Sequence, residues 1–118
     1  MRSSSAKNKG RVLQKFTRDL LLSLADHLEP DDVRSVSMGA GGEDVLLSPA
    51  ARRVFPVSIE CKNVERLNVW DAFSQAEANA GEYEPVLVFK KNRKDPKVMV
   101  DARFFFSLFT QNSLNSDT

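Results

Sequence analysis

Apolar residues recur at three- and four-residue spacing along the first part of the chain. They are Val12, Leu13, Phe16, Leu20, Leu24 and Leu28. This spacing is typical of a helix with one buried face, because side chains three and four positions apart share a face. Pro30 follows the last apolar position and favours a helix end there. The pattern predicts a helix over residues 12–28.

The middle of the chain contains three segments with strand-like patterns. Residues 32–38 alternate imperfectly, and residues 43–48 have an apolar centre at positions 45–47. The glycine-rich residues 39–42 predict a turn between them, and they lack the Lys-Ser/Thr of a phosphate-binding P-loop. Pro49 and Ala50 begin a predicted connector. Residues 55–63 form the third predicted strand.

The second half of the chain has the pattern of a helix, two strands and a last helix. Asn68 is a suitable N-cap and Gly81 a suitable C-cap for a helix that runs to about residue 80. The apolar run at residues 86–89 predicts a buried strand over 85–90, and residues 98–100 predict another. Asp101 can cap a last helix over about 102–109. The expected class is α/β (α+β), with a central mixed sheet flanked by helices in the order α-β-β-β-α-β-β-α.

Length and composition indicate one ordinary globular domain. The chain has 118 residues, of which 42% are hydrophobic and 28% charged. We expect a flexible basic tail over residues 1–9, one domain over 10–110 and a polar tail over 111–118. No apolar run is long enough to span a bilayer, so no membrane partner is expected. One cysteine fits a reducing compartment, and we expect the protein to be cytoplasmic.

Basic residues form two clusters although the formal net charge is only +1. One cluster lies in the first 18 residues and includes Lys9, Arg11 and Lys15. The other follows the strand at 85–90 and includes Lys90, Lys91, Arg93 and Lys94. Such clusters permit local binding of phosphate groups. On charge alone, the more common interpretation is that the first cluster is a solvated tail and the second a solvated loop.

Residues 57–62 combine an apolar face with a charged face. Because strand side chains alternate, Glu60 and Lys62 share the face opposite Ile59 and Cys61. Burying a charge is costly unless it is paired or binds a metal. An exposed ion pair between Glu60 and Lys62 is the simpler interpretation, and it would contribute little stability.

Asp44 supplies a second carboxylate if the neighbouring strands are antiparallel. Asp44 and Glu60 would then lie close enough to share a divalent cation, with the backbone carbonyl of Cys61 as a further ligand. Mg²⁺ suits this set, and Mn²⁺ is a substitute. Lys62 would project toward the same place, where it could orient or deprotonate an attacking water. By itself, an acid such as Asp44 is most often a turn residue.

Asp44 followed by Glu60-Cys61-Lys62, in this order of elements, resembles the PD-(D/E)xK nuclease superfamily over residues 9–109. Within it, the chain is most similar to small phage and archaeal enzymes that resolve Holliday junctions. The resemblance implies a restriction-endonuclease-like core. It also implies supporting roles for Gln14 on the first helix, where members often have an acid, and for Gln75 on the helix after the motif. Glu43 matches the approach to the acid. Unlike many members, the chain has no proline before Asp44.

The function expected from this resemblance is magnesium-dependent endonuclease cleavage of branched DNA, such as a four-way junction. The catalytic residues would be Asp44, Glu60, Lys62 and Gln75. The enzyme would act as a homodimer, because a resolvase cuts two symmetric strands, and it would need no organic cofactor. In a bacterial host, a phage-encoded enzyme would work in the cytoplasm.

Several alternatives stay open from the sequence. The enzyme could instead be a nicking, homing or restriction-like nuclease on duplex DNA. The protein could also be a non-catalytic nucleic-acid-binding protein on the same fold. Arg52 and Arg53 fit a phosphate contact or a solvated loop equally well, and Ser37 either approaches the site or ends a strand. An acid-x-Lys also occurs at residues 95–97, but Pro96 argues against a central strand there.

Overall fold

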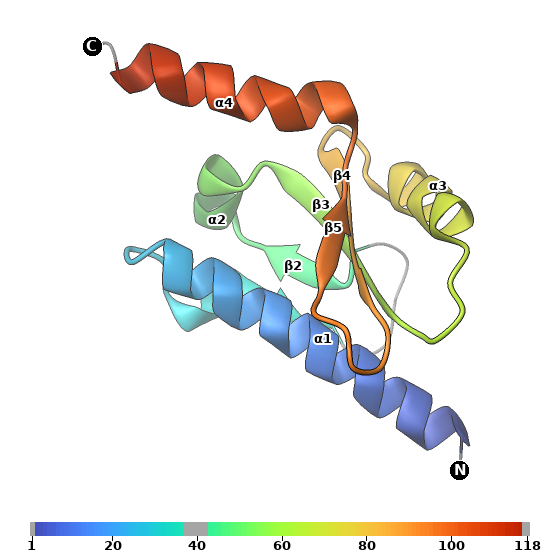
Figure 1. Ribbon diagram of the computed structural model, residues 1–118. Coiled ribbons are helices and arrows are strands. Elements are labelled where there is room, and N and C mark those ends of the chain that lie inside the picture. The colour runs from blue at the N-terminus through green and yellow to red at the C-terminus, as the bar shows by residue number, and fades with distance from the viewer. Residues whose placement is uncertain (1, 37–42, 117–118) are drawn as a thin grey trace.

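The computed structural model describes residues 2–36 and 43–116, and this part of the chain folds around one five-stranded sheet. The strands are β1 (Val33–Ser35), β2 (Val45–Leu47), β3 (Val57–Asn63), β4 (Glu84–Lys90) and β5 (Lys97–Met99). They lie side by side in chain order (Figure 1). β3 and β4 are parallel, whereas the other neighbouring pairs are antiparallel. The predicted α+β class with a mixed sheet is confirmed.

Two helices cover opposite faces of β3. Helix α1 (Arg2–Leu24) lies against the face that carries Cys61, because the Thr17 hydroxyl lies 3.8 Å from the Cys61 sulfur. Helix α3 (Val69–Asn79) lies against the other face, where Asn79 contacts Glu60. Each interface has its own apolar core. The α1 side includes Leu13, Val45 and Ile59, and the α3 side is built from Ala72, Phe73 and Leu87.

The first and last helices differ in extent from those predicted. Helix α1 begins at Arg2 and ends at Leu24, so residues 2–9 are helical where we expected a flexible tail. Helix α4 (Ala102–Ser116) continues past the predicted end at about residue 109, into the expected polar tail. Extending an existing helix avoids the cost of nucleation, so polar residues can continue a helix without an apolar pattern. Asp101 caps α4 as expected, because its carboxylate accepts from the backbone amides of Arg103 and Phe104.

A helix replaces the predicted connector at Pro49. Helix α2 (Pro49–Val54) begins after Ser48, whose side chain accepts a hydrogen bond from the amide of Ala51. Proline at the first helical position is favourable because its missing N–H would have no partner there. A short 3₁₀ turn, η1 (Pro30–Asp32), also precedes β1. Both elements are too short to show the apolar period on which the prediction relied.

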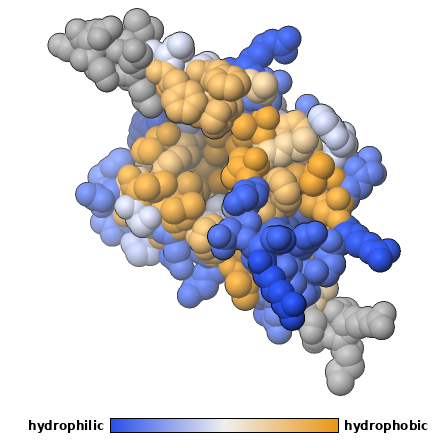
Figure 2. Space-filling model, in the orientation of Figure 1, coloured by the Kyte–Doolittle hydropathy of each residue, from blue (hydrophilic) through white to orange (hydrophobic). Residues whose placement is uncertain are grey.

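Hydrophobic side chains remain on the surface around α4. Phe106 is 64% exposed, and Phe105, Leu108 and Phe109 are also exposed. Figure 1 shows α4 running along one end of the sheet, and Figure 2 shows hydrophobic groups beside it and across the middle of that face. Among the described residues, no helix combines the length and hydrophobicity that a bilayer crossing requires.

Candidate functional site

Asp44 is held at the start of β2 by backbone and side-chain bonds. Its N–H donates to the carbonyl of Ile59, and its own carbonyl accepts from Val36, both at 2.9 Å. Val45 lies opposite Ile59 in the antiparallel register. The Asp44 carboxylate then accepts from the amide of Cys61 through Oδ2 at 2.8 Å. The predicted approach of Asp44 to the Glu60 strand is therefore present in the structure.

Glu60 is buried in the middle of β3. Its residue is 7% exposed, and its carboxylate oxygen Oε2 accepts from the side-chain amide of Asn79 at 3.3 Å. Burial raises the pKa of Glu60, and the negative charge of Asp44 raises it further. Asn79 and the positive charge of Lys62 act in the opposite direction. The two carboxyl groups therefore interact across the β2–β3 pair.

Lys62 and Glu60 share one face of β3, as the alternation predicts. Lys62 is half-buried, and its charge stabilises the ionised form of Glu60. The backbone of Lys62 lies opposite Phe89 in the parallel register with β4. The structure thus brings Asp44, Glu60 and Lys62 together at one place on the sheet.

Asn79, rather than Gln75, is the α3 residue that contacts this group. Gln75 is exposed, and its side chain makes no hydrogen bond to any residue that the structure describes. Asn79 lies four residues later, on the same side of the helix. Nothing in the sequence singles out Asn79, because its contact with Glu60 depends on how α3 lies across the sheet. The catalytic role of Gln75 stays a prediction.

The two carboxylates fit a hard divalent cation. The amide of Cys61 points toward β2, and in an extended strand the carbonyl of the same residue points to the same side. Asp44, Glu60 and the Cys61 carbonyl therefore offer oxygen ligands, which Mg²⁺ prefers. Within residues 2–36 and 43–116, no three His, Cys, Asp or Glu side chains gather as a metal cluster. A Mg²⁺ ion held here would keep several water ligands.

The Cys61 thiol itself is unsuited to act as a nucleophile or as a metal ligand. Burial raises its pKa to about 12, although a hydrogen bond with Thr17 acts in the opposite direction. A thiol with this pKa stays protonated at neutral pH, and only a thiolate is a good nucleophile or metal ligand. The contribution of Cys61 to the site is therefore through its backbone.

Glu43, which precedes Asp44 in the chain, forms an ion pair with Arg52. The guanidinium of Arg52 donates to Glu43 Oε1 and to the carbonyl of Val57, both at 2.7 Å, and lies 4.0 Å from the centre of the Tyr83 ring. These contacts occupy Arg52, so the structure gives it a positioning role. Arg53 is exposed and stays a candidate phosphate contact.

Gln14 is buried on α1, on the side of β3 opposite Glu60. Its residue is 9% exposed, and its Oε1 atom has no hydrogen-bond partner in the described ranges. No hydrogen bond joins Gln14 to Asp44, Glu60 or Lys62 in those ranges, and its supporting role stays a prediction. Ser37 lies outside the described residues.

The predicted basic contacts lie in two places. On α1, Arg11 and Lys15 are exposed, Lys9 is half-buried, and the Lys9 carbonyl accepts from the Asn63 side chain at 2.9 Å. The second group borders a cavity of about 570 Å³ between the β3–α3 loop and the β4–β5 hairpin. Its basic lining residues are Lys90, Lys91, Arg93, Lys94 and Lys97. Asp44 and Glu60 do not line this cavity.

Comparison with known proteins finds no matching family model, no matching curated protein and no matching solved structure. The chemistry of the site therefore rests on its own residues.

Proposed function

We propose that this protein is a magnesium-dependent DNA endonuclease of the PD-(D/E)xK type, with a restriction-endonuclease-like core. The observation that carries the proposal is the placement of Asp44 against the backbone of β3, beside Glu60 and Lys62. The negative charge of Asp44 raises the pKa of Glu60, and a cation between the two carboxyl groups would offset this repulsion. An ammonium group on the same face suits an attacking water or a phosphate oxygen.

Each residue of the site has a distinct role in this proposal. Asp44 and Glu60 hold Mg²⁺ together with the Cys61 carbonyl, and Mn²⁺ can substitute. The ion, when bound, neutralises charge on the scissile phosphate and makes a water more acidic. Lys62 orients that water and stabilises negative charge in the transition state. Asn79 holds the Glu60 carboxylate in place.

Branched DNA is the proposed substrate, and the protein is proposed to act as a homodimer. Exposed basic residues on α1 and on the β4–β5 hairpin are the proposed phosphate contacts, and such contacts position DNA without reading its sequence. A four-way junction has two equivalent strands to cut, so a symmetric pair of sites fits it. The exposed aromatic face of α4 supports an interface between two copies.

Cleavage assays with metal and matched variants test this function. Wild-type protein with Mg²⁺ or Mn²⁺ is expected to cut a labelled four-way junction in preference to flap, duplex or single-stranded DNA. Asp44→Asn and Lys62→Ala are each expected to lower the cleavage rate about 100-fold or more, because each removes a group that acts on the reacting phosphate or water. Asp31→Asn and Arg34→Ala, which change exposed charges elsewhere, are the controls.

Each contrary outcome identifies a different alternative. Preference for plain duplex would favour a nicking, homing or restriction-like enzyme. Absence of cleavage on every substrate, with binding intact, would favour a non-catalytic nucleic-acid-binding protein. Equal cleavage by wild type and both site variants would show that the site is misassigned.

A further inference from the structure

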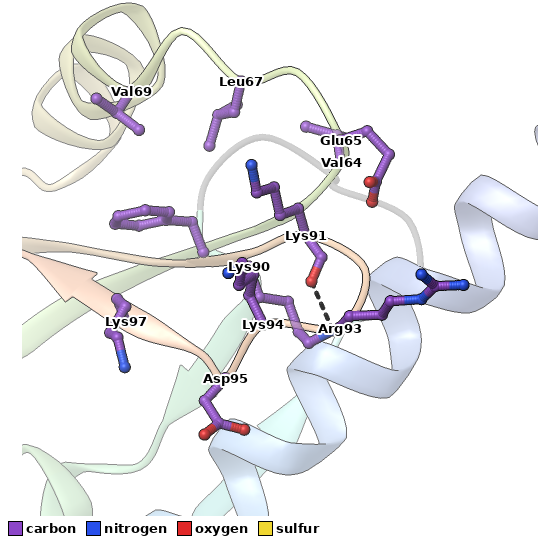
Figure 3. A pocket seen from close by; sticks show the side chains of 11 residues that line it. Val64, Glu65, Leu67, Val69, Lys90, Lys91, Arg93, Lys94, Asp95 and Lys97 are labelled. Atoms are coloured by element: carbon purple, nitrogen blue, oxygen red, sulfur yellow. Dashed lines mark hydrogen bonds between the residues drawn. The ribbon is translucent and has the colours of Figure 1, made fainter.

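The cavity beside the β4–β5 hairpin has two walls that are bonded to each other. The loop after β3 forms one wall, and residues of the hairpin form the other (Figure 3). Glu65 joins them, because its Oε2 accepts from the amide of Asn92 at 2.6 Å. Within the hairpin, the amide of Lys94 donates to the carbonyl of Lys91 at 3.1 Å. The cavity is thus formed by the fold itself, and its volume of about 570 Å³ lies in the range of ligand pockets.

The lining combines an apolar wall with an excess of positive charge. Val64, Leu67, Val69 and Phe89 supply the apolar part. The lining contains five basic residues and two acidic residues. One of the acids, Glu65, accepts a hydrogen bond from the backbone amide of Asn92. In Figure 3, the Lys91 side chain extends toward Leu67, whereas Asp95 and Lys97 point away from that loop. The lining therefore suits a ligand that has both an anionic group and a flat apolar group.

The cavity lies on the same sheet face as the proposed catalytic residues. Residues paired in a parallel ladder point to the same face, and Glu60 pairs with Leu87 and Lys62 with Phe89. Val64 follows Glu60 by four positions, roughly 13 Å at a rise of about 3.3 Å per residue. A DNA strand advances about 3.4 Å per nucleotide in a duplex, so this span corresponds to about four nucleotides.

We propose that the cavity receives an unpaired nucleotide of the DNA substrate, with its base against Leu67 and its phosphate near Lys91. The inference rests on the proposed nuclease function. It identifies an unpaired nucleotide as the feature of the DNA that the enzyme would select. In a duplex, each base is paired and stacked, and it must leave the stack before it can enter a cavity. At a branch point, the base stack is interrupted, so a base leaves it at a lower cost than in a continuous duplex. The cavity therefore favours DNA with unpaired bases a few nucleotides from the cut.

Binding measured in EDTA tests the cavity without cleavage. Three labelled probes are compared by fluorescence anisotropy: a plain duplex, the same duplex with one extra unpaired thymidine, and one in which that thymidine has no base. The thymidine probe is expected to bind about tenfold more tightly than the baseless probe, because contact of a base with a side chain has this order of effect. The baseless probe is expected to bind like the plain duplex.

Variants separate the apolar wall from the basic wall. Leu67→Gln is expected to remove the preference for the thymidine probe while plain-duplex affinity stays within about twofold. Val64→Ser, at a more exposed position, is expected to weaken the preference and serves if Leu67→Gln lowers the melting temperature. Lys91→Gln with Lys94→Gln is expected to weaken all three probes and to reduce the slope of log affinity against log salt by about two. Arg34→Gln with Arg103→Gln removes the same charge at exposed positions outside the cavity.

Equal affinity of wild type for the thymidine and baseless probes would overturn the cavity proposal, even in a protein that cuts DNA. Equal weakening by the cavity pair and the control pair would overturn it as well, because the effect would then be one of total charge. Absence of cleavage with Mg²⁺ would instead contradict the nuclease function, and it would leave the EDTA measurement unchanged.

Discussion

At the scale of single residues, backbone contacts rather than side-chain pairs set the geometry of the site. One oxygen of Asp44 accepts a hydrogen bond from the Cys61 amide, which fixes the carboxylate against β3. Glu60 is buried, and this burial is the main cause of its raised pKa. Its hydrogen bond from Asn79 offsets part of that cost. A substitution at Asn79 should therefore change the cleavage rate through its effect on Glu60.

The first prediction contrasts Asn79 with Gln75. Asn79→Ala is expected to lower the single-turnover cleavage rate about tenfold, because a hydrogen bond to a charged group contributes about 1.5–3 kcal/mol. It should also raise the Mg²⁺ concentration needed for half-maximal rate. Gln75→Ala, on the same helix, should change both values by less than about twofold. Metal titrations of the two variants decide between them, and a larger effect at Gln75 would reverse the assignment.

At the scale of elements, α2 shows how a short helix is fixed by its ends. The Ser48 hydroxyl accepts from the amide of Ala51 and donates to Asp32 Oδ1 at 2.6 Å. Asp32 also accepts from the amide of Glu29, so one carboxylate joins η1 to the start of α2. The hydrogen bond from Ser48, followed by that from Glu29, lowers the pKa of Asp32. This network positions α2, and hence Arg52, beside the site.

Loss of the Ser48 hydroxyl is expected to destabilise the fold in a pH-dependent way. Ser48→Ala should lower the free energy of unfolding by about 1 kcal/mol near neutral pH, the usual cost of removing an N-cap. A lowered pKa in the folded state stabilises the fold above the unfolded-state value, about 3.9 for Asp, and this stabilisation is lost as the pH falls through the folded-state value. The difference from wild type should therefore shrink below about pH 4.

Thermal unfolding monitored by circular dichroism at several pH values measures this difference. Ser74→Ala, at an exposed position within α3, is the matched control and should be neutral or slightly stabilising. A difference between wild type and Ser48→Ala that stays constant down to pH 3 would contradict the role of Asp32.

At the scale of the whole molecule, the apolar face of α4 stays exposed to solvent in a single chain. The radius of gyration is 14.8 Å, whereas a compact chain of this length has about 13.5 Å. The three rings of Phe105, Phe106 and Phe109 contact one another on the surface rather than in the core. Large apolar groups gathered in this way are typical of an interface.

The dimer prediction follows from this face. Wild-type protein is expected to have twice the 13.2 kDa mass of the chain by light scattering, and Phe106→Asp is expected to give a monomer. A charge placed in a buried apolar interface is costly because it loses its hydration. Arg103→Gln makes the same change in charge on the polar side of α4 and should stay dimeric. A monomeric wild type at all concentrations would remove α4 from this role.

Particular elements show how far the sequence could be interpreted. The strands at residues 57–63 and 84–90 and the α3 helix were predicted within one or two residues, because their apolar patterns are long and their caps are clear. Helix α2 was missed although Ser48 and Pro49 are both start signals, since six residues are too few to show a period. The contact between Asn79 and Glu60 could not be predicted, because it depends on how α3 lies across the sheet.

The sequence by itself determined which residues alternate on β3, so that Glu60 and Lys62 share a face, and it placed a second carboxylate just before β2. Those properties follow from local geometry, since a strand has a side-chain period of two. Only the tertiary structure decided that the Asp44 carboxylate reaches the Cys61 amide, that Arg52 is occupied by Glu43 and Tyr83, and that a basic cavity lies on the same face as Lys62. Register and helix placement set these contacts, and both depend on packing between segments that are distant in the chain.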